Sequence, residues 1–198
     1  MTHVRSSAIR TKISITRRNS NPAGHAFREK LRRHLSNRLK MPNFAVMEKN
    51  LKASLYEEIL RDAEALLGQE PDLVARMANA AALLHERMGF FWTGFYRTDG
   101  QELVLGPFQG PVACQRIGYG RGVCGTAWAQ DRTLVVPDVE AFPGHIACSA
   151  LSRSEIVVPL HKDGTVVGVL DIDSKALATF DDTDARALEK LCALIAGA

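Results

Sequence analysis

The sequence has only four cysteines in 198 residues, and no two of them form a C-x-x-C pair. This scarcity excludes a small disulfide scaffold, and the spacing argues against a zinc knuckle. No apolar run is long enough to cross a bilayer, so we expect no membrane partner. There is also no apolar signal segment, so a reducing compartment, the cytoplasm, is the expected location.

Acidic residues are almost absent from the first 40 residues, which hold eleven of the 25 Lys/Arg and a single acid, Glu29. The rest of the chain is therefore mildly acidic, although the formal net charge is +3. We expect no nucleic-acid partner, because that part has no basic patch. Residues 1–42 lack an apolar period and predict a disordered basic tail. Three interpretations of the tail stay open: a start assigned too early, with Met41 or Met47 the true one, a solvated tail, or an organelle-targeting peptide.

Residues 47–198 have the patterns of one domain. Helical spacing of apolar residues predicts two helices, over 51–66 and from Pro71 to Gly89. Two hairpins are expected around the turn pairs Asp99-Gly100 and Asp163-Gly164. A last helix is expected after Asp181 or Asp182, one of which caps it.

The middle of the chain, between the two hairpins, is irregular. Its expected elements are a third strand over 112–117, a glycine-rich loop over 118–125, a short helix over 123–130, a strand over 133–136 and a loop over 141–149. The whole order predicts an α+β fold, in which an antiparallel sheet carries helices mainly on one face.

Three of the four cysteines lie between residues 110 and 173. Cys148 follows a Pro-Gly turn, so its thiol is expected in a loop, where it can be exposed; the alternative is a small core residue. His145 could lower the pKa of Cys148 as in a Cys-His dyad. Cys114 lies in a strand-like run, and Cys124 stands between glycines where a short helix could begin. The fourth cysteine, Cys192, falls on the apolar face of the last helix and is expected in the core.

The same stretch holds three acids at or beside apolar strands. Asp171 and Asp173 alternate with an isoleucine, so both project from one face of a strand, and Glu155 opens another. If that face is solvated, the acids are ordinary; if it lines a pocket, one pKa should rise and a proton becomes available. Trp92 and Tyr96 can share a strand face, either as core aromatics or as the wall of a pocket for a small apolar group.

The strings GFYR, LGPFQG, ACQRIGYGRGVCGTA, PGHIACS, SEIVVPL and GVLDIDS follow one another in this order. Together they resemble the free methionine-(R)-sulfoxide reductases, a family built on a GAF domain. The resemblance runs from about residue 51 to residue 194. It implies a single GAF-like domain over 47–198 that reduces free L-methionine-(R)-S-oxide to L-methionine.

The resemblance also implies roles for individual residues. Cys148 matches the family's nucleophile, Cys114 its resolving cysteine and Cys124 a third cysteine that can enter alternative disulfides. The residues that match the substrate pocket are Trp92, Tyr96, Glu155, Asp171 and Asp173. Thioredoxin is the implied electron donor, and a homodimer is a further expectation. The implied thiol cycle needs no metal and no bound cofactor.

Two other functions compete with this prediction. A GAF sensory module would bind a small ligand without chemistry, but it has no need for the cysteine set. A hydrolase built on Cys148 and His145 would need an oxyanion hole and an orienting acid, and it leaves Cys114 unexplained.

Overall fold

A computed structural model describes residues 43–146 and 148–197, with side chains from residue 47 onward. The predicted basic tail, residues 1–42, lies outside this part of the chain. The described elements, in order, are α2 Asn43–Leu67, α3 Leu73–Met88, β1 Trp92–Thr98, β2 Glu102–Gln109, β3 Arg116–Gly118, α4 Gly122–Gln130, β4 Leu134–Val136, a 3₁₀ turn Val139–Ala141, β5 Ser154–Lys162, β6 Thr165–Ser174 and α5 Asp182–Ala196. None of the helices described is both long enough and apolar enough to span a bilayer.

The six strands form one antiparallel sheet in the order β3-β2-β1-β6-β5-β4. The two predicted hairpins, β1-β2 and β5-β6, are therefore confirmed. At the β5-β6 turn both residues are left-handed, with φ 51° at Asp163 and 73° at Gly164. Such a turn matches the twist of the strands it joins, which explains the Asp-Gly pair. The pairing of β1 with β6 brings the two hairpins together at the centre of the sheet.

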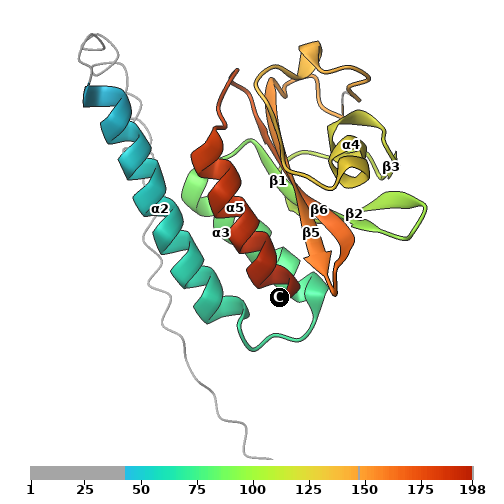
Figure 1. The fold of residues 1–198 in the computed structure, drawn as a ribbon, viewed down its shortest axis with the longest axis horizontal. Coiled ribbons are helices and arrows are strands. Elements are labelled where there is room, and N and C mark those ends of the chain that lie inside the picture. Colours follow the sequence, from blue (N-terminus) through green and yellow to red (C-terminus); the bar gives the residue numbers. More distant parts are fainter. Residues whose placement is uncertain (1–42, 147, 198) are drawn as a thin grey trace, which may run out of the picture. The chain divides into compact units, whose positions relative to one another are not determined.

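Helices cover the sheet unequally (Figure 1). α2, α3 and α5 lie on one face, where a large apolar core joins them to inward-facing residues such as Phe95, Ile156 and Leu170. α4 lies on the other face, over a smaller core that includes Trp92, Tyr96 and Cys124. The predicted arrangement, with helices mainly on one face, is confirmed. Because the second face carries only one short helix, part of it stays open for a pocket.

Three sequence predictions need correction. The first helix, predicted over 51–66, is longer and spans Asn43–Leu67. The second helix begins at Leu73 and not at Pro71, because Asp72 is its N-cap and accepts a hydrogen bond from the Ala75 amide. The predicted strand over 112–117 shrinks to β3, and Cys114 precedes it in a loop. Short apolar runs do not distinguish a strand from an extended loop, which is why the strand prediction overreached. The expected core position of Cys192 is confirmed, since it is buried.

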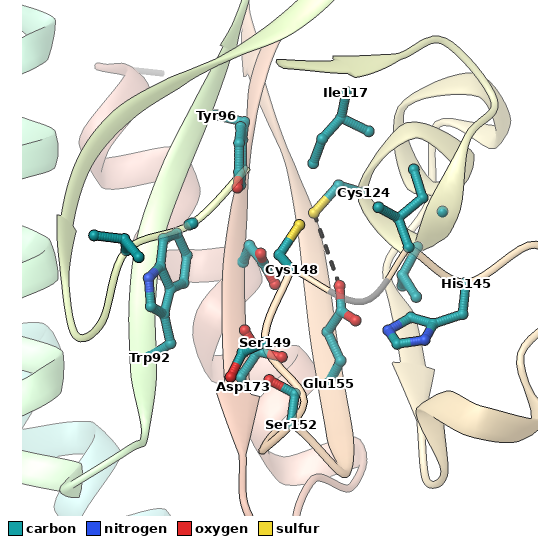
Figure 2. A pocket seen from close by; sticks show the side chains of 16 residues that line it. Trp92, Tyr96, Ile117, Cys124, His145, Cys148, Ser149, Ser152, Glu155 and Asp173 are labelled. Carbon is teal, nitrogen blue, oxygen red and sulfur yellow. Dashed lines mark hydrogen bonds between the residues drawn. The ribbon is translucent and has the colours of Figure 1, made fainter. Parts of the chain in front are cut away.

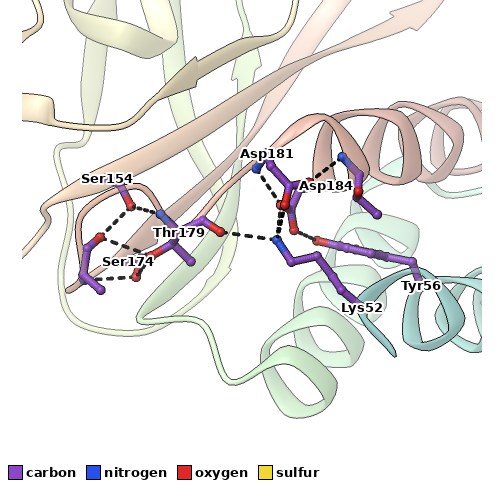
Figure 3. Close-up of polar contacts among 9 residues, drawn as sticks. Lys52, Tyr56, Ser154, Ser174, Thr179, Asp181 and Asp184 are labelled. Atoms are coloured by element: carbon purple, nitrogen blue, oxygen red, sulfur yellow. Dashed lines mark hydrogen bonds and ion pairs between the residues drawn. The ribbon is translucent and has the colours of Figure 1, made fainter. Parts of the chain in front are cut away.

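A polar cluster attaches α2 to the N-terminus of α5 (Figure 3). Lys52 Nζ lies 2.6 Å from Asp184 Oδ2 and 3.1 Å from Asp181 Oδ2. The Tyr56 hydroxyl donates to Asp184 Oδ1 at 2.8 Å. Asp181 and Asp184 also form a capping box, which confirms Asp181 as the predicted cap of this helix. A buried carboxylate at Asp184 is thus satisfied on every side.

The same cluster fixes the chain that leaves β6. Ser154 Oγ donates to the Ala176 carbonyl at 2.7 Å and accepts from the Thr179 amide at 3.3 Å. Lys52 Nζ donates to the Thr179 carbonyl at 3.3 Å. These bonds hold the ends of β5 and β6 in place. Glu155 and Asp173, the acids next to those ends, are positioned as a consequence.

Candidate active site

A pocket opens on the face of the sheet that carries α4 (Figure 2). Strand pairing builds its floor, because Asp173 on β6 pairs with Trp92 on β1 and with Glu155 on β5. Paired residues of antiparallel strands point to the same face and lie about 5 Å apart. Asp171, two residues before Asp173, lies on this face as well. The pocket thus has an aromatic side over β1 and an acidic side over β6 and β5.

Trp92 and Tyr96 form the aromatic side. Their rings are stacked with centroids 6.0 Å apart, and Phe108 stacks on the outer face of Trp92 at 5.4 Å. The indole Nε1 donates to the Pro111 carbonyl at 3.0 Å. Gly94 leaves room for the ring, since a Cβ there would come within 2.5 Å of Trp92 Cη2. The indole is held rigidly, as a wall for a small apolar group requires.

Cys114 and Cys148 form a disulfide across 34 residues of sequence, with their Cα atoms 5.4 Å apart. Cys148 is exposed and lines the pocket, whereas Cys114 is half-buried. The Tyr96 hydroxyl donates to the Cys114 carbonyl at 3.0 Å, which ties the loop before β3 to β1. The expectation of an exposed loop thiol at Cys148 is confirmed. The disulfide also accounts for Cys114, which a hydrolase leaves unused.

The three acids are largely withdrawn from water. Glu155 and Asp171 are each 7% exposed, and Asp173 is half-buried. Burial, followed by repulsion from the neighbouring acids, raises the pKa of Glu155 and of Asp171 well above the ordinary range. Burial raises the pKa of Asp173 to about 6, against the opposing effect of the Ser152 hydroxyl. At neutral pH the cluster therefore retains protons that it can donate.

Cys124 lies beneath the acids, in the first turn of α4. Its thiol is buried and donates to Glu155 Oε1 at 3.8 Å. Burial, followed by the charges of Asp171 and Glu155, raises the pKa of this thiol well above its usual value. Cys124 Sγ and carboxylate oxygens of Glu155 and Asp171 lie within 4.8 Å of one another, which is a possible ligand set for a metal. Because this set lines the same pocket as Cys148, where a thiol reaction can use a proton, we assign the cluster to proton chemistry.

The pocket brings together seven of the eight residues singled out from the sequence, and the eighth, Cys114, is bonded to one of them. His145 also lines the pocket. Two further lining residues, Ser149 and Ser152, were missed. Their only sequence signal is their place, since Ser149 ends the string PGHIACS and Ser152 lies between it and SEIVVPL, and isolated serines in a loop are common. Ser152 matters because its hydroxyl acts on the Asp173 carboxylate and lowers the pKa of that group.

The raised pKa of Asp173 predicts a cost in stability. A carboxyl whose pKa rises from 3.8 to about 6 on folding stabilises the fold below pH 4 and loses that contribution as the pH rises through 6. The loss amounts to about 3 kcal/mol at pH 8. We expect Asp173→Asn to raise the free energy of unfolding at pH 8 by a large part of this value, and to change it little at pH 4. Urea titrations at both pH values measure it.

The exposed Glu140 provides the matched control, Glu140→Gln. Glu140→Gln should leave the free energy of unfolding nearly unchanged at both pH values. A stabilisation by Asp173→Asn that is equal at pH 4 and pH 8 would contradict a raised pKa.

Comparisons with known proteins assign the chain to a family. Residues 69–198 match the family model described as GAF domain. The chain is 48% identical over 143 residues to the free methionine-R-sulfoxide reductase of Escherichia coli, an alignment that covers 72% of this chain and 87% of the relative. The chain belongs to the free methionine-R-sulfoxide reductase family. This confirms the family resemblance and, with it, the GAF fold.

Two further comparisons support the same family assignment. GAF domain-containing protein A of Dictyostelium discoideum is 55% identical over 150 residues, covering 75% of this chain and 95% of the relative. The X-ray structure of the free methionine-R-sulfoxide reductase from Neisseria meningitidis, in complex with its substrate, superposes with a TM-score of 0.72 at 57% identity. It covers 74% of this chain and 89% of that one. The match extends over the domain that carries the pocket.

Proposed function

We propose that this protein reduces free L-methionine-(R)-S-oxide to L-methionine. The observation that carries the proposal is the Cys114–Cys148 disulfide at a pocket with three raised-pKa acids and an aromatic wall. A sulfoxide has an electrophilic sulfur and a basic oxygen, so its reduction by a thiol needs both a nucleophile and a proton donor. In this proposal Cys148 is the nucleophile, and the acids supply the proton.

The reaction proceeds in three steps. The Cys148 thiolate attacks the sulfoxide sulfur while a protonated carboxyl of the cluster protonates the oxygen, which leaves methionine and a sulfenic acid on Cys148. The Cys114 thiol then attacks this sulfenic acid, forms the disulfide and releases water. An external dithiol, thioredoxin, finally reduces the disulfide by exchange and is itself oxidised. Two electrons thus pass from the donor to the sulfoxide.

The remaining residues orient the substrate. Trp92 and Tyr96 contact its methyl group, because they form the apolar side of the pocket. The acids over β5 and β6 attract its ammonium group as well as its oxygen. Cys124 donates to Glu155 and is less suited to resolve the sulfenic acid than Cys114, because a buried neutral thiol is a weak nucleophile. A disulfide cycle of this kind fits the reducing cytoplasm, and the expected homodimer stays a prediction for analytical ultracentrifugation.

The test is a thioredoxin-coupled assay that follows NADPH oxidation with free methionine sulfoxide. We expect turnover with the R epimer of the sulfoxide and little with the S epimer. Absence of turnover with either epimer, for a folded and fully reduced protein, would overturn the proposed function.

A blocked amino group should exclude the substrate. N-acetylmethionine-(R)-sulfoxide has no ammonium charge to pair with the acids and carries extra bulk, so we expect kcat/KM to fall by at least about 100-fold. The same coupled assay measures both substrates. Comparable rates on the two would show that the acids do not recognise the ammonium group.

A further inference from the structure

In the oxidised protein the disulfide lies at an open pocket, where an electron donor must reach it. Cys148 is an exposed residue and lines the open pocket, so an external thiol can approach the bond from this side. A protein donor, unlike a small thiol, must also dock on the residues that surround the bond. The inference that follows rests on the proposed function, because it names the surface that the electron donor uses.

Three large apolar side chains project into solvent close to this bond. Val112 is 87% exposed, Leu151 57% and Ile146 36%. Val112 lies two residues before Cys114, and Ile146 and Leu151 lie within three residues of Cys148. Because successive Cα atoms are 3.8 Å apart, all three Cα atoms lie within about 12 Å of a disulfide Cα atom. Val112 and Ile146 also stand at the mouth of the pocket.

The two segments that the disulfide joins have no Asp, Glu, Lys or Arg over 110–115 and 142–151. In a chain that is 24% charged, both segments lack these charged residues, and none of their positions that the structure describes is buried. They therefore form an uncharged, partly apolar surface beside the bond. We call Val112, Ile146 and Leu151 the disulfide rim. Single exposed apolar residues are ordinary, but depletion of charge around exposed apolar side chains is typical of the centre of a protein interface.

We infer that the disulfide rim is the docking surface of the electron donor, a protein of the thioredoxin type with an exposed dithiol. Its thiolate attacks the sulfur of Cys148, which forms a mixed disulfide and releases the Cys114 thiolate. The second donor thiol attacks this mixed disulfide, which releases the Cys148 thiolate and leaves the donor as a disulfide. The rim supplies the apolar contact that holds the two proteins together during both steps.

The inference is tested by comparing two reductants on the same variants. Leu151→Gln removes an apolar rim side chain that does not line the pocket. We expect kcat/KM for thioredoxin to fall by about 10-fold, the size of one well-placed interface contact. Turnover supported by dithiothreitol, which needs no docking surface, should stay unchanged. For Val112→Gln, at the pocket mouth, the ratio of the thioredoxin rate to the dithiothreitol rate should fall similarly.

Leu66→Gln is the matched control, because Leu66 is 48% exposed on α2, which covers the other face of the sheet. It should leave both rates unchanged. Three results would each overturn the docking surface. The rates with thioredoxin and with dithiothreitol could fall equally, neither rim variant could lose its thioredoxin rate, or the loss could be caused by dissociation of a dimer. The proposed function is judged separately, by the reduction of free methionine sulfoxide with dithiothreitol in the wild-type protein.

Discussion

Cys148→Ser is expected to lower turnover of free methionine-(R)-sulfoxide by about a thousand-fold or more, the range seen when a covalent nucleophile is removed. Serine has nearly the same shape, and its hydroxyl is far less nucleophilic than a thiolate. The exposed loop position of Cys148 leaves the apolar core untouched, so the variant should fold. Steady-state rates in the coupled assay measure the effect.

The reference for this variant is the fully reduced wild type, because a disulfide that closes a loop of 34 residues stabilises the oxidised protein by itself. Cys192→Ser is the matched control, since Cys192 is buried in the core among α5 residues. That control should lose stability while its folded fraction keeps full turnover. Sustained turnover by a well-folded Cys148→Ser protein would remove Cys148 from the mechanism.

Cys114→Ser is expected to separate the two halves of the reaction. Attack on the sulfoxide does not involve Cys114, so one methionine per chain should appear in a burst. Turnover supported by thioredoxin should then fall by about 100-fold, because no Cys114–Cys148 disulfide can form and the sulfenic acid must wait for an external thiol. Rapid-quench measurement of methionine, followed by the steady state, records both phases.

The residual rate of Cys114→Ser depends on Cys124, the remaining thiol beside the pocket. The combined Cys114→Ser, Cys124→Ser variant should retain the burst and accumulate a sulfenic acid on Cys148 that dimedone traps. If Cys114 is only a packed loop residue, its replacement lowers stability but leaves thioredoxin-supported turnover intact. That result would end the two-cysteine cycle, even with Cys148 as the nucleophile.

Local patterns sufficed to predict most of the secondary structure. The Asp-Gly turns, the helical spacing of apolar residues and the Asp181 cap each act over a few residues, and each produced the expected element. The strand over 112–117 was wrong because a short apolar run fits a loop equally well. There, the disulfide and the bond from Tyr96 to the Cys114 carbonyl hold the chain in place of strand pairing.

The site itself depends on contacts that local patterns do not encode. The row of Trp92, Asp173 and Glu155 exists only because β6 pairs with β1 on one side and β5 on the other. Alternation predicts that Asp171 and Asp173 share a face, but not which face or how deeply it is buried. The ion pair between Lys52 and Asp184 joins residues that are 132 positions apart in the sequence, and no local motif predicts it. Family resemblance supplied the residues of the pocket, and the strand order supplies the reason that they meet.

A single-turnover experiment tests the central claim most directly. Fully reduced protein is mixed with one equivalent of free methionine-(R)-sulfoxide without any donor, then denatured in an alkylating agent and mapped by peptide mass spectrometry. Our account predicts one methionine per chain, with Cys114 and Cys148 recovered as a disulfide and with Cys124 and Cys192 alkylated. Methionine formed while Cys114 and Cys148 both remain alkylatable, or a disulfide through Cys124 as the main product, would contradict it.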